Sequence, residues 1–389
     1  MNYFEESVEE KPTTVHSLID ENDNIRPLKE EPPTLDAFAN MKSLFTGHTD
    51  AVRAIAVDLA ASRIYTASWD ETVGVWNLPT RALIGVLPHG SWVNAVVLVQ
   101  GKHVGKVVVS GAEDGNISFW SVNDLLIVHQ IMPGSGPITL LTTLKDNVFA
   151  ASLNNVYCLS ASTGSVIREY REKVDVTSIV AHEEFLYCGL EDGRILCKEI
   201  VGGFILRELQ GHKGPVKALH VSGPTNTLCS GADDGLVKLW AMSTGLESET
   251  LSIHTKPIYA LAMHLRGGDR FLYSGSSDGT VKCTRLGMNQ TAVLMGTPPY
   301  CIALIGGKDS GHKKHSVPFL GSPLSAGAES PTSPAAHFGL SSFDTSLGGS
   351  SSTQEALVVV GDFSGRVELK KVEKFEDNLK FLPPPRKQG

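Results

Sequence analysis

One phrase recurs along the whole chain: an apolar run, a tight turn rich in Asp and Gly, and a second apolar run. It is clearest in SGADDGLVKLW, Ser230 to Trp240, where Asp234 is the acidic residue of the turn. The equivalent position in the other copies is held by Asp70, Asp114, Asn154, Asp192, Asp278 and Ser364. Successive copies are 44, 40, 38, 42, 44 and 86 residues apart, so the chain carries seven units and only the last interval is long. Self-similarity at a near-constant period of this length indicates a repeat architecture.

Each unit has the pattern of four short strands. In the fifth unit they are VKALHV, TLCSGA, LVKLW and ESETL, separated by Gly-rich and Asp-rich turns. Strands of this length between turn signals predict an antiparallel sheet. One small sheet cannot bury both of its faces, so neighbouring units must stack, and a closed ring leaves few exposed edges.

The best units resemble WD40 repeats. GHKGPVKALHV followed by LCSGADDGLVKLW is similar to the signature of that family, although no unit ends on a literal Trp-Asp pair and units three, four and seven lack both the His and the Trp. The resemblance implies an all-β, seven-bladed propeller over residues 41–370. The seventh unit ends after its third strand, and MKSLF, Met41 to Phe45, is available to complete it. We therefore expect an N-terminal strand to close the ring.

Three segments fall outside this pattern. We expect residues 1–40 to form a disordered acidic arm and residues 371–389 to form a C-terminal tail. Residues 306–354 are rich in Ser, Gly and Pro and are expected to be a disordered insertion in blade 7. Three Ser-Pro pairs in the insertion are candidate phosphorylation sites, the alternative being a neutral insertion: Ser322, Ser330 and Ser333.

The recurring His, hydroxyl and Asp have two interpretations. They are the residue types of a hydrolase triad, and GSSDG even matches G-x-S-x-G. A catalytic set is usually single, however, and the flanks of GSSDG are strands on both sides. The resemblance implies instead a structural relay of Trp, hydroxyl, His and Asp, in three complete sets: His48, Thr66, Asp70 and Trp76; His89, Ser110, Asp114 and Trp120; His212, Ser230, Asp234 and Trp240. The sixth unit keeps His254, Ser274 and Asp278 but has Thr284 in place of the Trp.

Function is then expected on loops that differ between units. The residue before the relay Asp and the residues that open the first strand should share one face. At these positions stand aromatic residues that would form an arc over neighbouring blades, and acidic residues that would suit a basic segment of a partner. The alternative is that the rings cap the core between blades. The candidate partner-binding residues are Trp69, Trp92, Tyr259, Phe363, Glu113, Glu191 and Asp233.

Composition restricts the class of function. The net charge of −8 argues against a nucleic-acid binder, and no apolar run is long enough to span a bilayer. Six cysteines without CxxC spacing are typical of buried thiols in a reducing compartment, so we expect a cytoplasmic protein, with the nucleus as an alternative. No cofactor, metal or small-molecule substrate is expected. The prediction is a non-catalytic scaffold that binds proteins or peptides; the alternative is the substrate receptor of a ubiquitin ligase.

Overall fold

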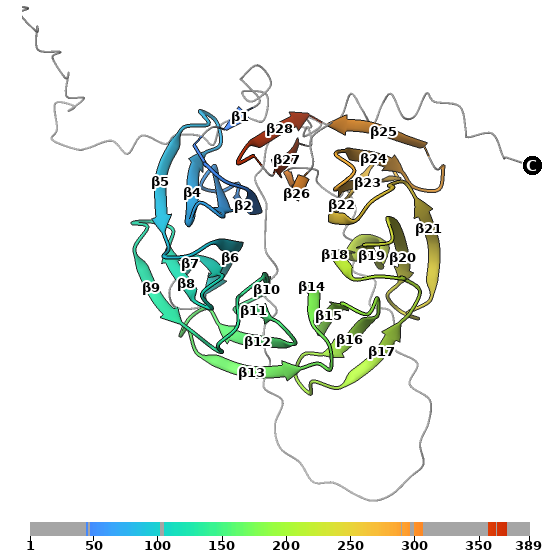
Figure 1. The fold of residues 1–389 in the computed structure, drawn as a ribbon, viewed down its shortest axis with the longest axis horizontal. Coiled ribbons are helices and arrows are strands. Elements are labelled where there is room, and N and C mark those ends of the chain that lie inside the picture. Colours follow the sequence, from blue (N-terminus) through green and yellow to red (C-terminus); the bar gives the residue numbers. More distant parts are fainter. Residues whose placement is uncertain are drawn as a thin grey trace, which may run out of the picture. The chain divides into compact units, whose positions relative to one another are not determined.

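The computed structural model describes residues 44–45, 47–101, 105–288, 290–295, 299–305, 357–362 and 364–371. The expected acidic arm, the insertion with Ser322, Ser330 and Ser333, and the tail from residue 372 onward lie outside the described residues. Within these ranges the chain forms seven four-stranded antiparallel sheets arranged as blades around a central axis (Figure 1). The first strand of each blade lies nearest the axis and the fourth lies outermost. This confirms the prediction of an all-β, seven-bladed propeller.

The strands follow the four-part pattern of the sequence. Blade 1 contains β2 (Val52–Asp58), β3 (Arg63–Ser68), β4 (Thr72–Asn77) and β5 (Leu83–Pro88). Blade 2 contains β6 (Val93–Gly101), β7 (Gly105–Ala112), β8 (Ile117–Ser121) and β9 (Ile127–Ile131). Blade 3 contains β10 (Leu140–Leu144), β11 (Asn147–Ser152), β12 (Asn155–Ser160) and β13 (Val166–Arg171). Blade 4 contains β14 (Val176–His182), β15 (Phe185–Leu190), β16 (Ile195–Glu199) and β17 (Ile205–Leu209).

The remaining blades continue the order. Blade 5 contains β18 (Val216–Ser222), a 3-10 turn (Gly223–Thr225), β19 (Thr227–Ala232), β20 (Leu236–Ala241) and β21 (Glu247–Ser252). Blade 6 contains β22 (Ile258–Arg266), β23 (Asp269–Ser276), β24 (Val281–Arg285) and β25 (Gln290–Met295). Blade 7 contains β26 (Pro299–Ile305), β27 (Leu357–Asp362), β28 (Val367–Lys371) and β1 (Leu44–Phe45). β28 thus extends one residue beyond the expected end of the propeller.

The two ends of the propeller meet in blade 7. β1 pairs antiparallel with β28, with Leu44 opposite Glu368 and Phe45 opposite Val367. Phe45 is buried, and its ring meets the indole of Trp76 edge-on at 5.8 Å between centroids. The predicted closing strand is therefore confirmed, over two residues of the expected five.

The core lies between neighbouring blades. A glycine near the end of the second strand repeatedly abuts the first strand of the next blade. A Cβ on Gly231 would lie 2.7 Å from Ile258, and one on Gly361 would lie 2.6 Å from Val52. Such contacts are too close for any side chain, so this glycine sets how tightly the blades pack. It explains the G in the recurring SGA and SGS words.

Candidate protein-binding face and the relay beneath it

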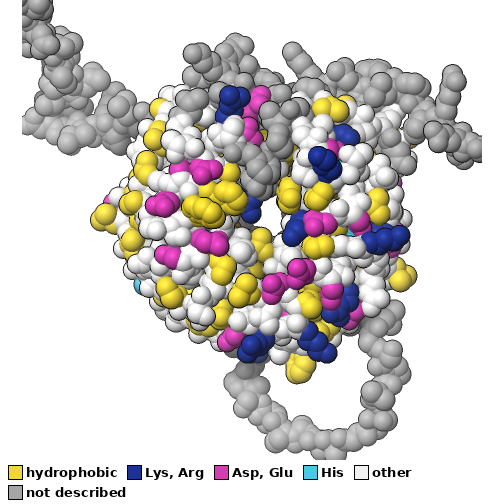
Figure 2. All heavy atoms as spheres, in the orientation of Figure 1, with side chains coloured by type: hydrophobic (Ala, Val, Ile, Leu, Met, Phe, Trp, Pro, Cys, Tyr) yellow, Lys and Arg dark blue, Asp and Glu magenta, His cyan; other side chains and the backbone are white. Residues whose placement is uncertain are grey.

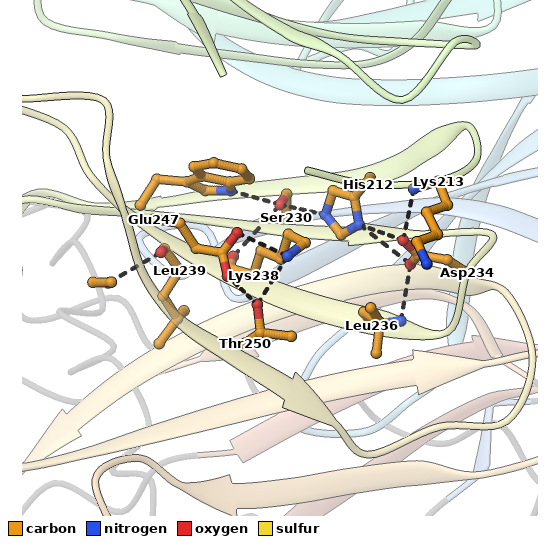
Figure 3. A network of polar contacts seen from close by, with 11 residues as sticks. His212, Lys213, Ser230, Asp234, Leu236, Lys238, Leu239, Glu247 and Thr250 are labelled. Carbon is orange, nitrogen blue, oxygen red and sulfur yellow. Dashed lines mark hydrogen bonds and ion pairs between the residues drawn. The ribbon is translucent and has the colours of Figure 1, made fainter. Parts of the chain in front are cut away.

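The predicted relay forms in blades 1 and 5. In blade 5 the indole N–H of Trp240 donates to Ser230 Oγ over 2.8 Å, and His212 Nε2 lies 2.8 Å from the same oxygen. His212 Nδ1 lies 3.0 Å from Asp234 Oδ2, as Figure 3 shows. In blade 1 the equivalent contacts of Trp76, Thr66, His48 and Asp70 measure 2.7, 2.6 and 2.6 Å. Each relay ties the third strand to the second, to the turn between them, and to the loop that enters the blade.

Counting donors assigns the protons. The carboxylate can only accept, so the His proton is on Nδ1, and Nε2 then accepts from the hydroxyl. The hydroxyl oxygen is left to accept from the indole. Asp70 also accepts from the backbone N–H of Thr49 and from the hydroxyl of Thr72. Burial would raise the pKa of the Asp70 carboxyl, but the hydrogen bonds from His48 and Thr72 lower that pKa to about 2.

The geometry excludes a hydrolase role for these sets. Thr66, Ser110, Ser230 and Ser274 are all completely buried. A nucleophile must reach its substrate, whereas these hydroxyls are enclosed, and those of Thr66, Ser110 and Ser230 each also accept from a buried indole. The relay is a structural network.

Blade 2 departs from the prediction at Asp114. Trp120 and His89 both meet Ser110 at 2.8 Å, as expected. His89 Nδ1, however, lies 3.1 Å from the carbonyl of Leu87, and Asp114 accepts instead from the side chain and backbone of Asn116. The cause is the length of the entering loop. One residue separates Leu87 from His89, whereas two separate Leu209 from His212, so the His89 ring is held back from the turn.

Blade 6 keeps a three-member relay. His254 Nδ1 lies 2.8 Å from Asp278 Oδ2, and its Nε2 lies 2.8 Å from Ser274 Oγ. Thr284 occupies the Trp position and bonds to Thr291 at 3.0 Å. The expectation for this unit is confirmed.

Blade 4 contains a buried ion pair in place of a relay, and the sequence pattern did not predict it. Lys198 stands opposite Leu186 in the position that Trp240 holds opposite Leu228. Glu172 follows the last strand of blade 3, where His89 follows that of blade 1, and pairs with the Lys198 ammonium. Both side chains are buried. An ion pair therefore replaces the Trp and His at this interface; the signal was a Lys inside an otherwise apolar strand, ILCKE.

The relay predicts that acidification destabilises the protein. Burial lowers the pKa of His89, His212 and His254, partly opposed for the latter two by Asp234 and Asp278. The unfolded chain therefore binds protons near pH 6.5 more readily than the folded chain, and the free energy of unfolding falls below that pH. A further loss follows between about pH 4 and 2, because hydrogen bonds hold the pKa of Asp70 and Asp278 at about 2 despite burial.

Melting temperatures measured from pH 8 to pH 4 check this expectation. The Tm should be nearly flat above pH 7 and should fall steadily below pH 6.5. In His212→Gln the slope between pH 7 and pH 5 should be smaller than in the unsubstituted protein. Equal melting temperatures at pH 7 and pH 5 would contradict the assignment of neutral, buried imidazoles.

The loop positions that the sequence predicts to bind a partner lie side by side on one face of the propeller. The residue before the relay Asp donates its backbone N–H to the segment that opens the first strand of the same blade, at 2.8 to 3.0 Å. These bonds join Trp69 to Ala51, Glu113 to Trp92, Glu191 to Asp175, and Asp233 to Pro215. Positions that are far apart in sequence thus form one surface.

Two indoles form the centre of that surface. Trp69 and Trp92 stack with centroids 5.0 Å apart and an interplanar angle of 23°. The Arg53 guanidinium lies 5.0 Å from the Trp69 ring, and Trp69 donates to Asn94 Oδ1 at 3.0 Å. Trp92 remains 47% exposed. Figure 2 shows hydrophobic side chains gathered over blades 1 and 2 beside the central opening, with acidic side chains around them.

Asn94 is a residue that the sequence analysis missed. Asn94 is buried. Its Oδ1 accepts from the Trp69 indole, and its Nδ2 donates to Glu113 Oε2 over 2.8 Å and to the carbonyl of Ile138 at the entry to the next blade. A polar residue in the buried run VNAVVL was the available signal. The Asn94 side chain fixes the Trp69 ring and one acidic group at the same time.

A cavity of about 470 Å³ opens at the mouth of the central channel. Its lining combines residues from six blades: some lie on or just before first strands, such as Arg53, Asp175 and Tyr259, and others in the turns that follow second strands, namely Leu153 and Glu191. Of the predicted binding residues, Glu191 and Tyr259 line this cavity. Trp69, Trp92 and Glu113 lie beside Asn94, which also lines it. Asp233 is half-buried and outside the lining, and Phe363 lies outside the described residues.

The fold and the relays define a class: a seven-bladed propeller whose blades are locked by Trp, hydroxyl, His and Asp. The family model "WD domain, G-beta repeat" matches residues 40–77, 203–241 and 245–284. These matches end in blades 1, 5 and 6. Each match begins shortly before the outer strand of one blade and ends on the third strand of the following blade. The chain thus contains WD40 repeats in these three ranges, within a seven-bladed propeller.

Relatives share this repeat at low identity. Autophagy-related protein 16 of Arabidopsis thaliana is 25% identical over 215 residues, covering 51% of this chain and 41% of the relative. Mitochondrial division protein 1 of Candida glabrata is 24% identical over 260 residues, covering 64% and 34%. An F-box/WD-40 repeat-containing protein of Arabidopsis thaliana is 24% identical over 255 residues, covering 60% and 46%. The matches thus span between about a third and a half of these relatives.

Among the described residues no helix is long and apolar enough to cross a bilayer.

Proposed function

We propose that the protein is a non-catalytic scaffold whose Trp69–Trp92 face binds a protein partner. The observation that carries this proposal is the exposed Trp92 ring, stacked on a second indole beside the channel mouth. Large aromatic side chains in such positions supply most of the binding free energy at many protein interfaces. The relay supports a non-catalytic role, since its hydroxyls are completely buried and cannot meet a substrate.

The indole platform is held in place before any partner arrives. Arg53 lies over one ring, Asn94 accepts from the Trp69 N–H, and the backbone of Trp92 is bonded to that of Glu113. Side chains that are already ordered lose little conformational entropy on binding, so more of the contact energy appears as affinity.

Charge at the channel mouth favours a basic segment. Asp175 and Glu191 both line the cavity, and their residues are joined by a backbone hydrogen bond of 3.0 Å. Within the described ranges neither carboxylate has a side-chain hydrogen bond or ion pair. Glu113 adds a third carboxylate beside Trp92. A partner with Lys or Arg flanking an apolar residue would complement this arrangement.

Two further expectations belong to this proposal. The cytoplasm or nucleus suits a protein whose six cysteines are free thiols. A role as the substrate receptor of a ubiquitin ligase remains the second candidate, and the relative named for an F-box and WD-40 repeats is the observation in its favour. Co-purification of ligase subunits with the full chain would select the second candidate.

The test is the substitution of one exposed residue. Trp92→Ala is expected to weaken the binding of specific partners at least tenfold in Kd, which corresponds to about 1.4 kcal/mol. Their recovery by affinity purification and mass spectrometry should therefore fall sharply. The matched control is Phe204→Ala, because Phe204 is also a large aromatic residue and is 69% exposed, but it lies immediately before β17, the outer strand of blade 4. Both variants should melt within a few degrees of the unsubstituted protein. A partner set that is lost in Phe204→Ala and kept in Trp92→Ala would overturn the assignment of this face.

A further inference from the structure

The stacked indoles leave one ring face open. Trp69 has the Arg53 guanidinium 5.0 Å from its ring and stacks on Trp92, with 5.0 Å between the indole centroids and 23° between their planes. Trp92 uses one face of its ring for this contact, and 47% of the residue remains exposed. Among the described residues no second ring and no cation lies over Trp92. The outer face of the Trp92 indole is therefore open to a further flat group.

A carboxylate lies beside this open ring. Glu113 donates its backbone N–H to the carbonyl of Trp92 at 2.8 Å, and its Oε2 accepts from Asn94 Nδ2 at 2.8 Å. The same Asn94 side chain accepts from the Trp69 N–H, so one amide fixes both the indole and the carboxylate. Glu113 is exposed, and within the described part of the chain its Oε1 has no hydrogen-bond partner. An acceptor is thus held next to the open face.

These charges favour a cation on the Trp92 ring. The face of an indole attracts cations, and a neighbouring carboxylate strengthens that attraction. An apolar side chain in the same place would shield Glu113 from water without giving it a counter-charge, which costs free energy. Figure 2 shows further acidic side chains around the hydrophobic patch over blades 1 and 2. The contact of Arg53 with Trp69 is the same kind of pairing, formed within the chain itself.

The shape of the site favours Arg over Lys. A guanidinium is planar, so it can lie parallel to an indole while its N–H groups point sideways to a carboxylate. An ammonium is a compact and strongly hydrated charge, and it gives up more hydration for a poorer fit to the ring. A ring face with a carboxylate at its side therefore suits a guanidinium better than an ammonium.

We propose that an Arg side chain of the partner continues the stack, with its guanidinium on the open face of Trp92 and its N–H groups donating to Glu113. The inference rests on the proposed function and names the residue by which the partner is anchored. It places the basic residue of the bound segment on the indole itself, and an apolar neighbour is then left for the channel mouth, where Leu153 is 50% exposed.

The probe is the peptide N-acetyl-Ala-Arg-Ala-amide, and the matched controls are the same peptide with Lys or Leu at its centre. Each is titrated into the full chain with isotope-labelled indole nitrogens, so that the five tryptophans report separately by NMR. The Arg peptide should shift the signal of Trp92, which is assigned by its loss in Trp92→Ala. Its Kd should be about threefold below that of the Lys peptide, and the Leu peptide should cause little shift. The signals of Trp76, Trp120 and Trp240, which are buried, should stay in place and report that the fold is intact.

Two variants test the carboxylate. Glu113→Gln removes the charge beside Trp92 and should raise the Kd of the Arg peptide about threefold. The matched control is Glu184→Gln, because Glu184 is also exposed but lies in the turn between β14 and β15, at the opposite end of the blade from the turn that follows a second strand. The Kd in Glu184→Gln should equal that of the unsubstituted protein.

Three results would overturn the guanidinium site. They are an unmoved Trp92 signal at peptide concentrations on the order of 10 mM, equal affinities for the Arg peptide and either control peptide, and equal affinities of Glu113→Gln and Glu184→Gln for the Arg peptide. If partners are lost in Trp92→Ala but the Arg peptide leaves Trp92 unmoved, the binding face stands and the guanidinium site falls. If the Arg peptide shifts Trp92 but all partners still bind Trp92→Ala, the guanidinium site stands and the proposed function of the face falls.

Discussion

Lys198→Met is expected to destabilise the propeller by about 3–5 kcal/mol, because it leaves the buried Glu172 carboxylate without its counter-charge. Both side chains are withdrawn from solvent at the junction of blades 3 and 4. The measurement is the midpoint of guanidinium-induced unfolding followed by tryptophan fluorescence. The effect should be visible as a large shift to lower denaturant.

Two controls make this expectation specific. Glu172→Leu/Lys198→Met removes both charges and should recover most of the lost stability, since a buried pair can often be replaced by apolar groups of similar size. Lys217→Met removes a half-buried Lys that has no side-chain polar partner among the described residues, and should change little. If Lys198→Met is no less stable than Lys217→Met, the buried pair does not lock the blade.

Trp240→Ala is expected to cost about 3–5 kcal/mol through the cavity that it leaves and the donor that Ser230 loses. Trp240 is almost completely buried between blades 4 and 5. The same unfolding measurement applies, and Trp92→Ala is the control of equal size change. Because Trp92 is 47% exposed, its loss should cost well under half as much. Equal losses in the two variants would contradict the relay's role in holding the blade together.

The propeller could be predicted because its locks use fixed residue types at fixed spacing. A buried indole, hydroxyl and imidazole need partners, so their recurrence carries information about neighbours that are distant in sequence. Asp114 was the one relay member predicted wrongly. A loop one residue shorter before His89 changes which acceptor the ring reaches, and that geometry is not contained in the identity of the residues.

The ion pair of blade 4 could not be predicted for a different reason. Lys198 and Glu172 are residue types that usually lie in solvent, and their burial depends on the packing of two blades. The pattern that found the other locks searched for Trp and His. Only the strand register places Lys198 at the position of an indole.

The proposed binding face could be predicted in the positions of its residues and not in their contacts. The repeat pattern places Trp69 and Trp92 on neighbouring blades, and in the structure their rings stack. The third member, Asn94, points toward them from within a strand that is otherwise apolar.

The junction of β1 with β28 has a consequence for local unfolding. Among the described residues, two pairs join β1 to β28, whereas the other outer strands pair over four or more. Short terminal pairings open with far less free energy than the whole domain. Amide exchange should therefore be fastest in blade 7, and release of Phe45 would also expose the edge of the Trp76 ring.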